Sequence, residues 1–150
     1  MTSYDVHVTA FAELDARTGY LLWQLREAVF VVEQHCPYPE LDGRDLEPAT
    51  RHVWVSYDGQ PIAYLRVLDD GPDARIGRVC VAASHRGRGL AETLMRAAIE
   101  VVGERPSRLS AQSYLVGWYS RLGYAADGPE FLEDGIPHVP MARPGSAGGH

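Results

Sequence analysis

Apolar and polar residues repeat along the chain in two rhythms, one typical of strands and one typical of helices. Residues 5–11 alternate between apolar and polar side chains, which predicts a half-buried strand. A helical repeat then predicts a helix over residues 18–32, with Thr18 or Asp15 as its cap. The apolar stripe of this helix consists of Leu21, Leu22, Leu25, Val29 and Val32.

Three further strands are separated by strong turn signals. Residues 51–57 and 60–68 flank Asp58-Gly59, a pair that favours a two-residue hairpin turn. Residues 69–73 are rich in Asp, Gly and Pro and predict a second turn, and residues 74–81 predict the next strand. The spacing therefore predicts consecutive strands joined by hairpins.

Residues 78–95 combine a strand end, a turn rich in Arg and Gly, and the start of a helix predicted over residues 89–103. The first N–H groups of a helix have no internal partner and its dipole favours an anion, while glycine lets the backbone approach a ligand closely. This stretch therefore predicts a phosphate site. Its parts are Val79, Cys80 and Val81, then Arg86, Gly87, Arg88 and Gly89, then Leu90, Leu94, Ala97 and Val101 on one helix face.

The remaining elements complete one domain. The predictions are a strand over 108–112, a helix over 113–122 with Leu115, Trp118, Tyr119 and Leu122 inward, and strands over 124–126 and 136–141. This order predicts an α/β (α+β) domain over residues 1–144, with a mixed sheet that is antiparallel at the front and has a parallel crossover at the central helix. Residues 145–150 have no large apolar side chain and predict a disordered tail.

Composition narrows the class of protein. The net charge of −6 argues against nucleic acid as the main partner, because phosphate contacts need clustered Lys and Arg. The first residues lack a signal-peptide pattern, and no apolar run approaches the roughly 20 residues of a membrane span, so we expect a cytoplasmic protein. The two cysteines do not suggest a disulfide framework, and Cys80 is interpreted as a small buried hydrophobic residue.

Residues 33–50 form the longest stretch without a strand or helix pattern. They contain Pro37, Pro39, Gly43 and Pro48 among several carboxylates. Long loops in compact domains are often functional. Glu40, Asp42 and Asp45 can be a solvated surface or can bind a cationic acceptor, and the sequence leaves both interpretations open.

Three kinds of phosphate site compete for the turn. A Walker loop needs a lysine, and the chain has none. A dinucleotide fingerprint needs a third glycine where Glu92 stands. The third pattern, Arg-x-x-Gly-x-Ala, is met by Arg86, Gly89 and Ala91.

This pattern and several others resemble the GNAT family of N-acetyltransferases. Its signature turn matches residues 86–91, and its aromatic-Tyr-x-x-x-Gly-aromatic stretch matches residues 118–124. Within the family the chain is similar to the ElaA-like branch, and the resemblance covers nearly the whole chain. The matching pieces are residues 25–34, 36–38, 40–45, His52 and 132–138.

The resemblance implies acetyl-CoA as co-substrate and a sheet whose fourth and fifth strands splay apart around the pantetheine arm. Main-chain groups of Val79 and Val81 would pair with the pantetheine amides, as in β-augmentation. Amides from Arg86 to Ala91 would hold the pyrophosphate. The coenzyme-binding set implied is Val79, Cys80, Val81, Arg86, Gly87, Arg88, Gly89, Leu90, Ala91, Gln112 and Tyr119.

The reaction implied is direct attack of an amine on the thioester. Tyr119 matches the position whose hydroxyl protonates the coenzyme A thiolate, whereas Trp118 and Tyr124 are interpreted as packing residues. The base or acceptor-site candidates are Glu33, Glu40, Asp42 and His52, with Glu133, Asp134 and His138 behind them. Each also has a structural explanation, such as a cap, a solvated loop or a hydrogen bond. No metal-ligand spacing occurs, so no metal is expected.

The predicted function is transfer of the acetyl group of acetyl-CoA to a primary amine of a small molecule, a peptide or protein N-terminus, or a lysine. The alternatives are an acyltransferase that uses another acyl-CoA and a non-catalytic acyl-CoA-binding regulatory domain. Neither nucleic acid nor a membrane is expected as a partner. A homodimer is expected because domains of this family often dimerise.

Overall fold

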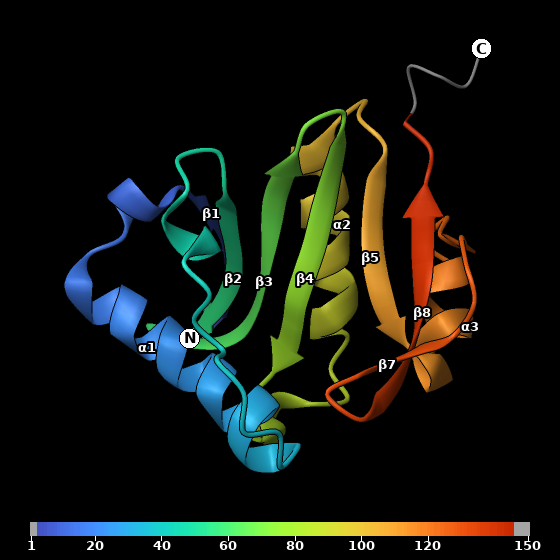
Figure 1. The fold of residues 1–150 in the computed structure, drawn as a ribbon. Coiled ribbons are helices and arrows are strands. Elements are labelled where there is room, and N and C mark those ends of the chain that lie inside the picture. The colour runs from blue at the N-terminus through green and yellow to red at the C-terminus, as the bar shows by residue number, and fades with distance from the viewer. Residues whose placement is uncertain (1–2, 146–150) are drawn as a thin grey trace.

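A computed structural model describes residues 3–145 and shows a mixed β-sheet flanked by helices (Figure 1). In these residues the sheet order is β1-β2-β3-β4-β5-β8-β6, and β7 pairs with β8. The strands are β1 (Tyr4–Thr9), β2 (Arg51–Tyr57), β3 (Gln60–Asp70), β4 (Asp73–Val81), β5 (Ser107–Gln112), β6 (Ala125–Ala126), β7 (Phe131–Glu133) and β8 (Ile136–Arg143).

Three α-helices and several tighter or wider turns connect these strands in the described residues. The helices are α1 (Ala16–Arg26), α2 (Leu90–Val102) and α3 (Val116–Ser120). The other turns are η1 (Phe11–Glu13), η2 (Glu27–Glu33), η3 (Arg44–Leu46), η4 (Ala83–His85) and η5 (Ser113–Leu115). No helix within residues 3–145 is long and apolar enough to cross a membrane.

The predicted fold is confirmed, including the separation of the fourth and fifth strands. β4 and β5 run parallel and pair only where Ala74 meets Ser107 and Arg75 meets Arg108. Beyond that point they diverge toward their carboxyl ends, as Figure 1 shows. On either side of this split the neighbouring pairs β3–β4 and β5–β8 are antiparallel.

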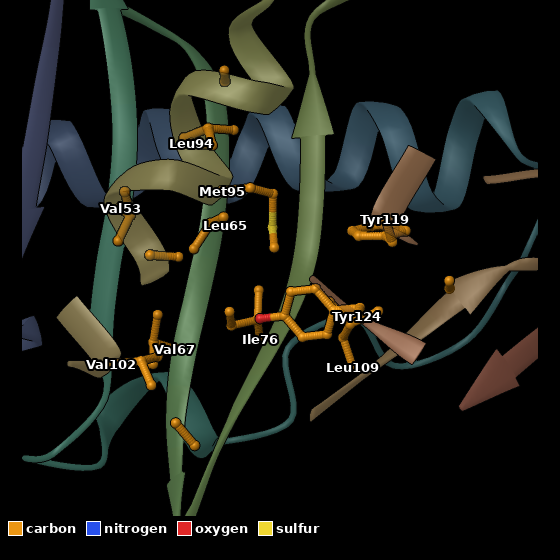
Figure 2. Packing of buried hydrophobic residues seen from close by; sticks show 14 of the residues in the cluster. Val53, Leu65, Val67, Ile76, Leu94, Met95, Val102, Leu109, Tyr119 and Tyr124 are labelled. Carbon is orange, nitrogen blue, oxygen red and sulfur yellow. The ribbon is translucent and has the colours of Figure 1, made fainter. Parts of the chain in front are cut away.

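The two faces of the sheet carry different helices. α2 buries Leu94 and Met95 against Leu65, Val67 and Ile76 on one face (Figure 2). α1 packs on the opposite face, where Leu22 and Leu25 contact Tyr64 and Cys80. Burial of each such large apolar side chain contributes about 1.5–3 kcal/mol, so the packing of both helices stabilises the sheet.

The first helical region differs in detail from the prediction. α1 begins at Ala16, and Asp15 is its cap because a carboxylate oxygen accepts the Thr18 N–H at 2.7 Å. From Glu27 the chain winds more widely as the π-type turn η2, where the Cys36 N–H reaches the Val31 carbonyl at 3.1 Å. A wider winding rotates the apolar face, so Val32 is 63% exposed instead of facing inward.

Smaller corrections concern the ends of elements. β1 stops at Thr9, and the helix predicted over residues 113–122 is divided between η5 and the short α3. β7 was not predicted. On α2 the core face runs through Met95, Ala98 and Val102, while Ala97 and Val101 are only partly buried. Of the predicted tail, residues 146–150 lie outside the described residues.

Candidate active site

A cavity of about 690 Å³ fills the split between β4 and β5. It extends from the start of α2, past β4 and β5, to the β7–β8 hairpin and the segment after η2. Among its lining residues are the predicted coenzyme-binding residues Val79, Cys80, Val81, Arg86, Gly87, Gly89, Leu90, Ala91, Gln112 and Tyr119. Most of the predicted set therefore meets in one place.

The glycine turn presents main-chain donors to this cavity. Gly87 and Gly89 have φ angles of +78° and +74°, a backbone conformation that favours glycine. No side chain caps α2, and its first intrahelical bond runs from the Thr93 N–H to the Gly89 carbonyl at 3.1 Å. The preceding N–H groups of the helix have no intrahelical partner, which makes this end suited to an anion.

The arginine side chains of the turn are engaged elsewhere. Arg86 forms a two-pronged ion pair with Glu33 at 2.5 and 2.6 Å, and its Nε donates to the Val81 carbonyl at 3.0 Å. Arg88 donates to the Tyr4 hydroxyl at 3.0 Å and does not line the cavity. The main chain of the turn, rather than its arginines, is thus the part left available to a ligand.

A bulge in β4 lies beside the cavity. Tyr64 pairs with Cys80 and Arg66 with Gly77, so two residues of β4, Arg78 and Val79, stand opposite one residue of β3. Arg78 adopts a φ of +58°. In the described residues Val79 has no register partner on either β3 or β5, which leaves an irregular stretch of backbone next to the cavity.

Tyr119 lines the cavity from α3 and is almost fully buried. Its ring makes edge contacts with Trp118 and Tyr124, whose centroids lie at 4.9 and 6.3 Å. Figure 2 shows Tyr119 and Tyr124. Burial, and then the neighbouring Tyr124 and Tyr114, raise the pKa of Tyr119 to about 12. The phenol therefore keeps its proton at neutral pH, as a proton donor must.

The base and acceptor-site candidates Glu33, Asp42 and His52 lie in different places. Glu33 lines the cavity, but its ion pair with Arg86 lowers the pKa of its carboxyl group. Asp42 and His52 do not line the cavity. His52 is fully buried: its ring nitrogens lie 2.6 Å from the Tyr64 hydroxyl and 3.0 Å from the Asp45 carbonyl, and burial lowers its pKa.

The acidic loop after η2 is held by ion pairs with the sheet and α1. Arg26 is completely buried and donates to Glu40 at 2.6 Å and to Asp45 at 2.7 Å. We call the set Arg26, Arg66, Arg78, Glu40, Asp42 and Asp45 the arginine–carboxylate network. Its three arginines are matched by three carboxylates, so these carboxylates neutralise the protein's own arginines.

Asp42 is the most exposed carboxylate of this network. It receives two bonds from Arg66, at 2.6 and 2.9 Å, and these hold the pKa of its carboxyl group well below its usual range. Tyr38 adds a hydroxyl contact to Glu40 at 3.0 Å and lines the cavity beside Arg78. The network thereby builds one wall of the cavity.

His138, a secondary candidate for the base or the acceptor site, lies in the cavity wall. β8 pairs it with Gln112 of β5, and its ring stacks on Phe131. Its Nδ1 donates to the Ile136 carbonyl at 2.7 Å, which leaves Nε2 with the lone pair in the neutral ring. Nε2 lies 3.8 Å from Glu133. The placement depends on the β7–β8 hairpin, which the sequence pattern did not predict.

Comparison with known proteins fits this geometry. The family described as acetyltransferase (GNAT) domain matches residues 19–143. The chain belongs to the GNAT acetyltransferase family. The chain is also 40% identical to protein ElaA of Escherichia coli over 146 residues, which cover 93% of this chain and 94% of ElaA. The predicted resemblance is confirmed.

Other proteins are similar to this chain in sequence or in structure. The UPF0039 protein Rv2851c of Mycobacterium tuberculosis is 51% identical over 139 residues, which cover 89% of each chain. An acyl-CoA N-acyltransferase of Pseudomonas aeruginosa has a TM-score of 0.89 and 43% identity, covering 94% of this chain and 99% of that one. The crystal structure of E. coli ElaA also has a TM-score of 0.89 and covers the same shares of the two chains.

Proposed function

We propose that this protein transfers the acetyl group of acetyl-CoA to a primary amine. One observation carries the proposal: the glycine turn at the start of α2 opens into the same cavity as a buried Tyr119. The first feature suits the diphosphate of a coenzyme, and the second suits protonation of a leaving thiolate. The family and fold support an acyl-CoA transferase in general.

The residues present fit coenzyme A. A Cβ at Gly87 or Gly89 would meet no protein atom within 4 Å, and both glycines line the cavity, so the turn leaves room for a pyrophosphate to approach its backbone. The N–H groups from Leu90 to Glu92 would bind it. Val79, at the bulge without a register partner, would pair with the amides of the pantetheine arm.

Two side chains would handle the protons. Acetyl-CoA supplies the thioester: the amine nitrogen bonds to its carbonyl carbon and the carbon–sulfur bond breaks. Tyr119 holds a proton for the departing thiolate sulfur. His138 Nε2, whose tautomer is set by the Ile136 carbonyl, accepts the proton that the amine loses. Glu33 is a weaker base candidate because Arg86 occupies both of its carboxylate oxygens.

Calorimetry and thiol release test this function. Acetyl-CoA and coenzyme A should both bind, and thiol should appear only when a primary amine is added. Failure of both to bind would disprove the proposal. Equal or faster turnover of longer acyl-CoAs would favour the broader acyltransferase, and binding without thiol release across a broad amine screen would favour a regulatory domain.

A further inference from the structure

The inner end of the cavity lies where β4 and β5 separate. Arg75 and Arg108 form the last parallel pair, and the cavity lining starts at Arg75. Around this end the lining contains Arg66 and Leu68 of β3, Arg75 and Ile76 of β4, and Leu109 and Ser110 of β5. Its polar groups are therefore two guanidinium groups and a hydroxyl group, all of which can donate hydrogen bonds.

Arg75 differs from the other arginines that line the cavity. Arg66, Arg78 and Arg86 each form an ion pair with a carboxylate. Within residues 3–145, the only hydrogen bond of the Arg75 side chain goes from Nη2 to the Ser110 hydroxyl at 2.9 Å, and no carboxylate pairs with it. Since the arginine–carboxylate network is already balanced, the charge of Arg75 remains uncompensated.

Arg66 provides a second free donor at the same end. Its residue is only 4% exposed, and both terminal nitrogens bind Asp42 or Asp45. Its Nε has no hydrogen-bond partner in the described part of the chain. A buried donor without a partner costs about 1–3 kcal/mol, so Arg66 has hydrogen-bonding capacity at this end that the described part of the chain does not satisfy.

The alternation of the strands shows which face these groups serve. Ala74, Ile76 and Leu109 pack in the cluster that includes α2, so Arg75 and Ser110 point to the opposite face. On β8, Val139 and Met141 pack toward α2, which places His138 on the same face as Ser110. The proposed coenzyme turn belongs to α2. Arg75, Ser110 and His138 therefore lie on the face opposite α2, which leaves them to an acceptor rather than to the coenzyme turn.

We propose that the acceptor is a primary amine that also carries a carboxylate, which binds Arg75 and Ser110 while the amine lies at His138. This proposal rests on the proposed function. His138 pairs with Gln112, two residues beyond Ser110, so Ser110 and His138 are offset by about 7 Å along the strands. Arg75 is in register with Arg108, two residues before Ser110, and its side chain reaches the Ser110 hydroxyl at 2.9 Å. Short ω-amino acids and dipeptides match this spacing, and a guanidinium group binds a carboxylate strongly.

Matched amine pairs test the proposal through thiol release from acetyl-CoA. γ-Aminobutyrate is compared with butylamine, and glycylglycine with glycylglycinamide. The carboxylate member of each pair should have the higher kcat/KM, by about 10-fold or more. Arg75→Gln should lower kcat/KM for the carboxylate members about 10- to 100-fold, because a hydrogen-bonded charge pair is lost, and change butylamine less than about 2-fold.

Control variants separate this effect from general damage. Arg108→Gln removes the same charge from the neighbouring strand, but Arg108 pairs with Asp73 and Asp127 and does not line the cavity, so preference should be retained. Arg75→Lys should keep part of the preference, and Ser110→Ala should weaken it less than Arg75→Gln. Melting curves show which variants are folded, and either Arg75→Lys or Ser110→Ala suffices if Arg75→Gln does not fold.

Several results would overturn the proposal while the proposed function stands. These are equal turnover within both pairs, turnover of neutral amines alone, and a preference that survives Arg75→Gln. A preference for succinyl-CoA over acetyl-CoA that requires Arg75 would place the carboxylate on the acyl group. It would overturn this proposal and would also favour the broader acyltransferase over acetyl transfer. Absence of acetyl-CoA binding would instead remove the proposed function, and this proposal with it.

Discussion

The two sides of the cavity are built by different means. On the α2 side, a short turn offers main-chain N–H groups, and its left-handed glycines leave open space beside it. On the α1 side, arginines from α1, β3 and β4 and carboxylates from the acidic loop after η2 form the arginine–carboxylate network. The first arrangement needs little more than a local backbone shape, whereas the second needs the complete fold.

One contact joins the two sides. Glu33, at the end of η2, binds both terminal guanidinium nitrogens of Arg86 in the glycine turn. Both side chains are partly exposed, at 46% and 43%, so the pair is a modest source of stability. It nevertheless determines which groups of the turn remain free for a ligand.

The largest expected effect comes from breaking the network at its centre. Arg26→Met leaves Glu40 and Asp45 buried without their shared partner, and we expect a loss of about 3–5 kcal/mol of unfolding free energy. Urea denaturation measures this change. Arg17→Met, on the exposed side of α1, is the control and should cost less than about 0.5 kcal/mol. A loss in Arg26→Met as small as that in Arg17→Met would show that the network contributes little to stability.

Tyr119→Phe tests the chemistry on the coenzyme side. We expect kcat to fall about 100-fold, because a general acid is removed, while the Kd for acetyl-CoA changes less than about 3-fold. Tyr114→Phe, with a side chain 81% exposed, is the matched control and should retain turnover. Because burial raises the pKa of Tyr119 to about 12, ionisation of this acid should not reduce wild-type turnover between pH 7 and about pH 10. Wild-type kcat in the Phe variant would remove the assigned role.

Gly89→Ala tests the backbone shape of the turn. The left-handed φ of +74° costs a residue with a Cβ about 1–2 kcal/mol, so we expect the turn to relax to another conformation. Acetyl-CoA should then bind about 10-fold more weakly, as measured by calorimetry. Gly71→Ala introduces the same strain at a φ of +86° in the β3–β4 turn, where a Cβ also meets no atom within 4 Å. Equal coenzyme affinity in the two variants would contradict a phosphate site at Gly89.

The smallest effect is expected where the two sides meet. Glu33→Gln releases Arg86, whose guanidinium group can then approach the coenzyme phosphates, so acetyl-CoA should bind about 2- to 5-fold more tightly. Thermal unfolding should change little, because exposed ion pairs contribute about 0–1 kcal/mol. Glu47→Gln breaks the comparable pair with Arg44 away from the cavity and should leave coenzyme affinity unchanged. Weaker binding in Glu33→Gln would show that the ion pair shapes the turn.

Much of the fold could be predicted from local patterns. The Asp58-Gly59 turn, the strands beside it and the glycine turn before α2 each depend on neighbouring residues, and all are present. Tyr119 was predicted from the family resemblance over residues 118–124, a stretch that begins in α3 and runs past its end. Its location in the cavity follows from the position of α3 beside β5.

The acceptor side could not be predicted in this way. Glu40 lies 14 residues from Arg26 and 38 residues from Arg78, and only the folded sheet brings the three together. The sequence predicts His52 as a site residue, but both of its ring nitrogens are hydrogen-bonded within the protein, to the Tyr64 hydroxyl and the Asp45 carbonyl. The sequence pattern does not single out Arg75, because its distinguishing feature is that no carboxylate within residues 3–145 pairs with it, which only the folded structure reveals.

The network has a further chemical property, because every one of its cations is a guanidinium group and the chain contains no lysine at all. A guanidinium group stays protonated at any pH where a protein is folded, so it has no lone pair with which to attack a thioester. The scaffold therefore offers no side-chain amine to an acyl donor. Thiol release from such a donor therefore carries no background from lysine acylation.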